Sequence, residues 1–194
     1  QWWDMSRAAD LEAFEAALSR LQVPVFNVLY ADRDGHILYV FNGRVPKRPG
    51  GTYLDWLGAV SGDTSETLWT DYLSYHELPR VLDPPSGWLQ NANDPPWTST
   101  FPAALDPVRY PPFLAPQFMH FRAQQSASLL AADQSISFEE LVAYKHWTVM
   151  LLADRLVDDL VAAAREHGSA TARAAAEVLA EWDRTADADS RGAV

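Results

Sequence analysis

Residues 77–97 read ELPRVLDPPSGWLQNANDPPW and decide how the middle of the chain folds. Proline fixes its own φ angle and restricts the residue before it, so this segment predicts neither a helix nor a central strand. We expect a stiff, extended path, because a mobile loop is more usually rich in Gly and Ser. Such a path would hold Asn91 and Asn93 in defined positions, and rigid side-chain amides indicate directed hydrogen bonds.

These two asparagines allow two interpretations from the residues alone. A side-chain amide cannot act as a nucleophile or a general acid, but its NH₂ group can donate to an oxyanion that develops during acyl transfer. Alternatively, both side chains satisfy the backbone of their own turn, as asparagine commonly does. Both interpretations stay open at this stage.

The composition of the chain excludes several classes of protein and partner. Its 194 residues are 48% hydrophobic, which is enough for a sizeable core. The formal net charge of −11 argues against nucleic acid and anionic membrane surfaces as partners. No apolar run reaches the roughly 20 residues of a membrane-spanning helix.

The sequence predicts neither a metal site nor a cofactor. It has no cysteine, which excludes disulfides and cysteine-ligated metals. The five histidines are scattered along the chain without the spacing of a helical metal-binding pair. We therefore expect them to lie at the surface or at the edge of the core.

The first part of the chain predicts a helix followed by a β-hairpin. Asp10 is a candidate N-cap for an amphipathic helix over residues 10–21. Strands are expected near 25–31 and 36–42, because β-type residues flank an Asp-Gly pair. Residues 43–118 look irregular, with a short helix or strand in each of 53–60 and 65–75, and we expect them to wrap other parts of a larger body.

The last part of the chain predicts helices. Residues 117–132 form one candidate helix, and the capping-box sequence at Ser137 opens a second that continues to about residue 166. Its apolar face includes Leu152, Leu156 and Leu160. An Ala-rich helix over 169–182 follows. We divide the chain into residues 1–118, a helical portion over 119–182 and a polar tail over 183–194.

Three blocks in this order carry a resemblance to a known family. They are FNVLYADRDGHILYVFNGRVPKR (26–48), ELPRVLDPPSGWLQNANDPPW (77–97) and FRAQQSASLLAADQSISFEELVAYK (121–145). Together they resemble the penicillin acylase family of N-terminal-nucleophile amidohydrolases. The resemblance is closest to the branch that contains acyl-homoserine-lactone and aculeacin-type acylases, chiefly through ISFEELVAYK.

The resemblance implies an α+β fold, namely a fragment of the αββα N-terminal-nucleophile hydrolase fold. It would contain one β-hairpin, a long irregular Pro-rich segment and a helical C-terminal part. In this family the nucleophile is a serine at the first position of the β chain, and its own α-amino group serves as the base. On the motif match Asn93 would stabilise the oxyanion, and Arg122 would support the active site. Asn91 is left as turn structure.

The chain departs from the family at its first residue, because Gln1 has neither a hydroxyl nor a thiol. The resemblance therefore implies an interior portion of a β chain that is inactive by itself. Its partners would be the rest of the precursor and a small acyl-amide substrate. Family members bind a structural calcium, but no ligand for it can be assigned here. Export to the periplasm or beyond is expected by resemblance only.

Two other interpretations compete with an acylase. A chain with eight tryptophans could be a non-catalytic module that binds sugars, peptides or another protein. It could also be a non-catalytic relative that keeps the scaffold for packing alone.

Overall fold

The computed structural model describes residues 1–193, which form two compact units, one up to Ala131 and one from Ala132 onward. The first unit contains a three-stranded antiparallel sheet with the order β1-β2-β3. The predicted hairpin is confirmed as β1 (Phe26–Ala31) and β2 (Ile37–Asn42). Gly35 lies in the turn with φ of +94°, a conformation that glycine adopts at little cost.

Strand β3 (Arg80–Leu82) was not predicted from the Pro-rich segment. It is three residues long, follows Pro79 and, within residues 1–193, pairs only with β2, so it lies at an edge of the sheet. Proline is tolerated at an edge because it does not interrupt a ladder on both sides. The expectation that this segment forms no central strand is therefore confirmed.

Strand β2 is the centre of the first unit and is buried on both faces. Leu38, Tyr39 and Val40 are each 0% exposed. Because side chains alternate along a strand, Leu38 and Val40 point to one face and Tyr39 to the other. The first pair packs with Leu18 of the N-terminal helices, whereas Tyr39 packs with Trp97 of the Pro-rich segment. The sheet therefore needs two separate layers to cover it.

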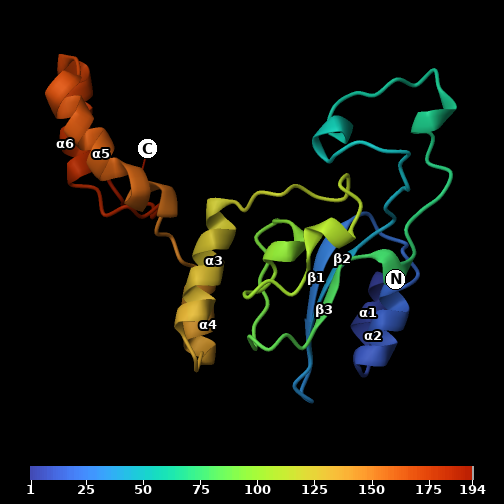
Figure 1. The fold of residues 1–194 in the computed structure, drawn as a ribbon. Helices are drawn as coiled ribbons and strands as arrows, with labels where there is room; N and C mark the ends of the chain where they lie inside the picture. The colour runs from blue at the N-terminus through green and yellow to red at the C-terminus, as the bar shows by residue number, and fades with distance from the viewer. Residues whose placement is uncertain (194) are drawn as a thin grey trace. The chain divides into compact units, whose positions relative to one another are not determined.

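Two N-terminal helices supply the first of these layers (Figure 1). Helix α2 (Leu11–Leu18) confirms the predicted helix but ends three residues before the expected end at residue 21. The Asp10 carboxylate accepts a hydrogen bond from the Ala13 N–H at 2.8 Å. Helix α1 (Trp2–Arg7) precedes it and was not predicted. At six residues it is too short for a periodic apolar pattern to be recognised.

An ion pair joins α2 to the sheet edge. The Arg80 guanidinium donates from Nε and Nη2 to the two carboxylate oxygens of Glu15, at 2.5 and 2.7 Å. The Tyr75 hydroxyl donates to the same carboxylate at 2.7 Å. These bonds hold the pKa of Glu15 below its usual value, against the opposing effect of burial. They fix the helix layer against β3.

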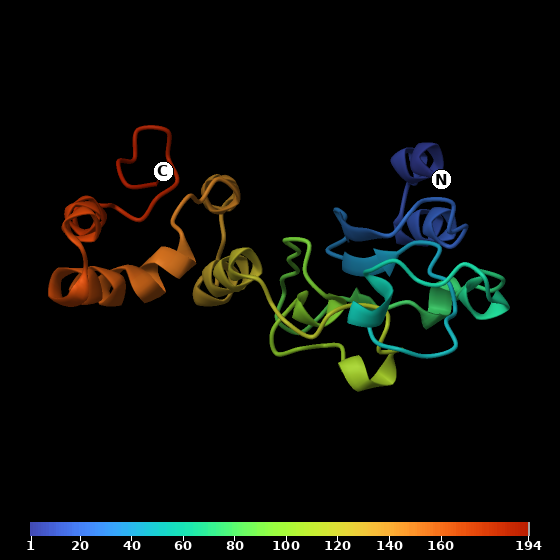
Figure 2. The same cartoon turned by 90° about the horizontal axis from the view of Figure 1, so that it is seen from above.

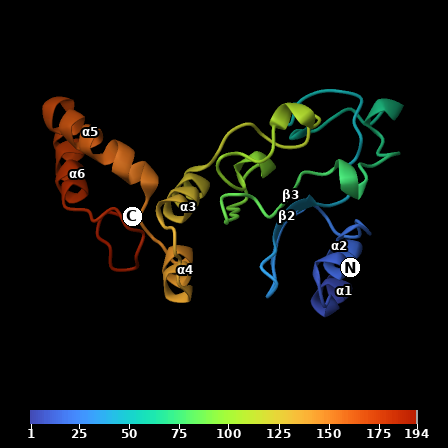
Figure 3. The same ribbon diagram turned by 60° about the horizontal axis from the view of Figure 1, so that its bottom comes forward.

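The Pro-rich segment supplies the second layer, as Figures 1 and 3 show for the green to yellow-green chain beside the strands. Residues 43–118 contain β3 and short 3₁₀ turns but no α-helix. Two of these turns, Leu54–Trp56 and Ser65–Thr67, fall within the stretches expected to hold short elements. The segment was expected to wrap a larger body, but here it packs on the sheet of its own chain.

The helices of the C-terminal part begin with α3 (Phe121–Ala132), which starts four residues later than the prediction from residue 117. Helix α4 (Phe138–Lys145) has the predicted capping box, in which Ser137 and Glu140 bond each other's backbone N–H groups. Helix α5 (Leu151–His167) and helix α6 (Ala170–Ala180) pack together, as the orange and red helices in Figure 2 show.

The prediction of one continuous helix from Ser137 to about residue 166 was wrong. Helix α4 ends with His146 as its C-cap, and the separate helix α5 begins at Leu151. Between them the backbone pairs with the C-terminal segment: Met150 N–H donates to the Arg184 carbonyl at 2.8 Å, and Ala186 N–H donates to the Thr148 carbonyl at 3.0 Å. These non-local bonds replace the local helical ones.

The leucine face predicted for α5 is not the face that packs on α6. The buried side chains of α5 are Ala153, Val157 and Val161, which form a cluster with Ala176. Leu152, Leu156 and Leu160 remain 40–54% exposed. Small residues permit close approach of the two helices, so packing selected this face over the more hydrophobic one.

The Glu15–Arg80 pair gives a test of this fold. Glu15→Gln in the intact protein removes a charge that faces a partly buried guanidinium and should lower the free energy of unfolding by about 1–2 kcal/mol. Urea denaturation measures the change. Glu12→Gln, on the exposed face of the same helix, is the matched control and should stay within about 0.5 kcal/mol of the parent. Equal losses in both variants would contradict the role of the pair.

Candidate active site

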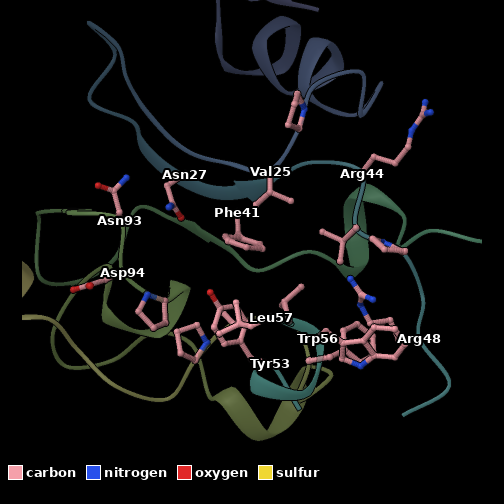
Figure 4. A pocket seen from close by; sticks show the side chains of 18 of the residues that line it. Val25, Asn27, Phe41, Arg44, Arg48, Tyr53, Trp56, Leu57, Asn93 and Asp94 are labelled. Carbon is pink, nitrogen blue, oxygen red and sulfur yellow. The ribbon is translucent and has the colours of Figure 1, made fainter. Parts of the chain in front are cut away.

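A cavity of about 580 Å³ lies in the first unit between the sheet and the Pro-rich layer. Its walls are largely apolar and include Phe41 of β2, Tyr53 and Leu57. Figure 4 shows Asn93 and Asp94 at one end of this pocket and Arg48 and Trp56 at the other. A mainly apolar hollow with a few polar groups is the usual form of a small-molecule site.

The turn at one end of the pocket is held by Asn91. Its Oδ1 accepts a hydrogen bond from the Asn93 backbone N–H at 2.8 Å, and its Nδ2 donates to the Asp94 carbonyl at 3.0 Å. The turn interpretation is therefore confirmed for Asn91. Asn93 itself has φ of +67°, a left-handed conformation that asparagine tolerates better than most residues.

The side chain of Asn93 is bound by Arg122, the second residue predicted for the site. Arg122 Nη2 donates to Asn93 Oδ1 at 3.2 Å. Because a guanidinium has no acceptor, this contact fixes the amide with its oxygen toward Arg122. Among residues 1–193, Nδ2 of Asn93 has no hydrogen-bond partner. The structure thus brings the two predicted residues together and leaves an exposed N–H donor at the pocket.

Asp94 is a pocket residue that the sequence did not single out. It is only 3% exposed, and its Oδ1 accepts from the backbone N–H of His120, the residue before α3, at 3.3 Å. Its Oδ2 is buried and has no partner in the described part of the chain. Burial raises the pKa of this carboxyl group. Asp94 ties the asparagine turn to the start of the helix that carries Arg122.

Asn27 adds a second amide to the pocket wall and was also missed. Its Oδ1 accepts a hydrogen bond from the Tyr39 hydroxyl at 2.5 Å. Burial raises the pKa of Tyr39, so this phenol stays a donor at neutral pH. Alternation along β1 places Asn27 on the same sheet face as Tyr39, a signal that could have been read once the hairpin register was known.

Arg48 marks the opposite end of the pocket. Its guanidinium carbon lies 4.0 Å from the centroid of the Trp56 ring and 5.8 Å from that of Trp69. The sequence showed only a basic turn here, because both tryptophans come from other loops. This stacking places a cation on an apolar wall.

The tryptophans do not form a single exposed platform. Trp97 is buried and donates from its indole N–H to the Pro116 carbonyl at 3.0 Å. Trp182 donates to the Thr185 carbonyl in the second unit. Within residues 1–193, no three His, Asp or Glu side chains are grouped as metal ligands. None of the helices in the same range is long and apolar enough to cross a membrane.

Comparison with known proteins places these features in a family context. The family model described as penicillin amidase matches residues 1–194. The chain is 30% identical over 167 residues to penicillin acylase 2 proenzyme from Pseudomonas sp. (strain SE83), covering 86% of the chain and 20% of that protein. It is 29% identical over 234 residues to aculeacin-A acylase from Actinoplanes utahensis, covering 99% of the chain and 29% of that protein.

A solved structure matches the fold. The thermostable penicillin G acylase from Alcaligenes faecalis aligns with a TM-score of 0.64 at 21% identity, over 97% of this chain and 32% of that chain. The α+β class and the assignment to a fragment of this N-terminal-nucleophile fold are therefore confirmed. The chain spans less than a third of the length of each curated relative that it matches.

The buried Asp94 carboxyl predicts a pH-dependent stability difference. The pKa of this carboxyl group is raised in the folded state, so above about pH 4 the folded state binds more protons than the unfolded state. The free energy of unfolding therefore falls as the pH rises from about 4 through the folded pKa. Asp94→Asn keeps an acceptor for the His120 N–H but cannot ionise. Urea denaturation of the intact protein between about pH 4 and 7 should show the variant gaining stability relative to the parent as the pH rises. A difference that does not change with pH would contradict this.

Proposed function

Because this chain belongs to the penicillin amidase family, we propose that it is part of an amidohydrolase, an acylase that cleaves the amide between an acyl group and a polar amine. Asn93 supplies a hydrogen-bond donor to the oxyanion, and Arg122 positions that donor. The observation that carries the proposal is the contact between Arg122 and Asn93 Oδ1, which leaves the amide N–H unpaired at the pocket.

The chemistry follows from where charge develops. When a nucleophile adds to an amide carbonyl, the C=O π electrons move to the oxygen and a negative charge appears there. A fixed N–H donor stabilises this charge more than it stabilises the neutral carbonyl, and it needs no reorganisation during the step. Collapse of the tetrahedral intermediate re-forms the C=O bond and breaks the C–N bond, and the amine leaves with the proton that the base took from the nucleophile. Water then hydrolyses the acyl–nucleophile bond and releases the acid.

The nucleophile of this reaction is proposed to come from another part of the same protein. The family resemblance assigns that role to a serine at the start of a β chain, with its α-amino group as the base. One relative is a proenzyme by name, in keeping with partners that derive from one precursor. Residues 1–194 would then supply the oxyanion amide without the nucleophile and would be inactive alone.

The substrate is proposed to be an acylated amine of the penicillin, acyl-homoserine-lactone or lipopeptide type. The names of the relatives, penicillin acylase 2 and aculeacin-A acylase, support this range. The apolar walls of the pocket suit an acyl chain or an aromatic ring. A periplasmic or secreted location is proposed by resemblance to the family.

Removing the Asn93 amide tests its role directly. Asn93→Gly in the intact protein should lower kcat by about 100- to 1,000-fold and leave KM within about threefold, because the donor acts mainly in the transition state. Glycine is preferred to alanine since it accepts the φ of +67° without strain. Asn93→Asp keeps an oxygen for Arg122 but loses the donor, so it should be equally impaired. An unchanged kcat in either variant would reject the assignment.

A double-mutant cycle tests the positioning role of Arg122. Arg122→Met should lower kcat by about tenfold or more when Asn93 is present, because the amide is then free to rotate. In the Asn93→Gly background the same substitution should have little further effect, since Arg122 acts through that amide. Steady-state kinetics of the four proteins give the coupling. Additive losses would mean that Arg122 acts independently of Asn93.

A further inference from the structure

Arg48 is a pocket cation without an acidic partner in the described part of the chain. Its neighbour Lys47 shows the contrast, because its ammonium lies 3.6 Å from the Asp71 carboxylate and 3.5 Å from that of Glu77. The acid closest to Trp56 in sequence, Asp55, accepts hydrogen bonds from the Thr52 backbone and hydroxyl instead. These three carboxylates are therefore engaged with other groups, in a chain whose net charge is −11.

The setting of Arg48 leaves its hydrogen-bonding edge unused. The guanidinium carbon lies over the ring faces of Trp56 and Trp69, at 4.0 and 5.8 Å from the ring centroids. The N–H donors of the guanidinium lie in its own plane. Among residues 1–193 those donors have no hydrogen-bond acceptor. Trp56 is itself held by a 2.9 Å hydrogen bond from its indole N–H to the Gly50 carbonyl, so the stack is fixed.

Partial burial makes an unpaired cation costly. Arg48 is partly buried, and this burial lowers its pKa, although arginine remains charged at neutral pH. The aromatic faces offset part of the lost hydration. A carboxylate that met the free edge could form a bidentate, charge-assisted pair, which is the arrangement that a guanidinium favours. The side chain is thus preorganised for an anion.

We propose that Arg48 binds a carboxylate carried by the ligand that occupies this pocket. The proposal deepens the proposed function and rests on it: with the scissile carbonyl at Asn93, one substituent of the amide runs along the apolar wall and ends at Arg48. Figure 4 shows these two residues at opposite ends of the pocket. The carboxylate belongs either to the acyl side or to the amine side of the substrate.

Two matched substrate pairs separate these sources. On the acyl side, the monoanilide of adipic acid is compared with the neutral compound in which the free acid is a carboxamide. On the amine side, hexanoyl-para-aminobenzoate is compared with hexanoyl-para-aminobenzamide. In one pair the intact protein should show a KM about 10- to 100-fold lower for the carboxylate than for the neutral analogue. Equal KM values within both pairs would overturn the proposal.

Substitution of Arg48 tests whether it is the group responsible. Arg48→Gln should abolish the preference for the carboxylate and leave the KM of the neutral analogue within about threefold. Arg48→Lys should keep part of the preference, because it retains charge without the bidentate fork. Arg109→Gln is the matched control, since Arg109 is an exposed arginine of the same Pro-rich layer that does not line the pocket, and it should leave the preference intact. A preference that survives Arg48→Gln would overturn the proposal.

A binding measurement on the unsubstituted protein separates this proposal from the proposed function and does not depend on the folding of any variant. Calorimetry should show that one of the two carboxylates binds about tenfold or more tightly than its neutral analogue. This carboxylate is either adipic acid monoanilide, on the acyl side, or hexanoyl-para-aminobenzoate, on the amine side. The same carboxylate should protect Arg48 from phenylglyoxal, as mapped by mass spectrometry. If the protein binds the carboxylate selectively but does not cleave the substrate, the acylase function is rejected and the anion site at Arg48 is retained. If the protein cleaves the substrate but shows neither selective binding nor protection of Arg48, the anion site is rejected and the acylase function is retained.

Discussion

The burial of strand β2 on both faces is the constraint on which the first unit depends. Leu38 and Val40 need the helices α1 and α2, and Tyr39 needs the Pro-rich layer, because all three side chains are removed from solvent. The hydroxyl of the same Tyr39 donates a hydrogen bond to Asn27, which lines the pocket. The interior of the sheet and the geometry of the candidate site are therefore set by one strand.

The two side-chain amides of the pocket, Asn27 and Asn93, share a pattern in which the oxygen is occupied and the N–H donors remain. The carbonyl oxygen of Asn27 is taken by Tyr39, and that of Asn93 is taken by Arg122. Arg48 offers a charged donor edge on an apolar wall. Such a surface is complementary to a ligand rich in acceptors, such as a carbonyl that becomes an oxyanion and a carboxylate. Asp94 differs from these amides, because its Oδ2 is an acceptor without a partner among residues 1–193 and burial favours the neutral form of the carboxyl group.

Backbone rigidity explains how a segment without regular structure can carry a site. Prolines on both sides of the asparagine turn restrict the chain, and the side chain of Asn91 closes the turn internally. Asp94 then connects the turn to His120, at the start of the helix that carries Arg122. Asn93 does not lie in a helix or strand. It is positioned by the flanking prolines and by hydrogen bonds to the start of the helix that carries Arg122.

The sequence by itself determined the hairpin, the N-capped helix α2, the capping box of α4 and the family, because these depend on local turn chemistry, periodicity and ordered motifs. It also named Asn93 and Arg122 through the motif match. Only the tertiary structure decided that β3 pairs with β2, that the chain breaks between α4 and α5, and that Asn27, Arg48 and Asp94 line one pocket. The physical reason is that these features come from contacts between segments distant in sequence, where packing and non-local hydrogen bonds override local preference.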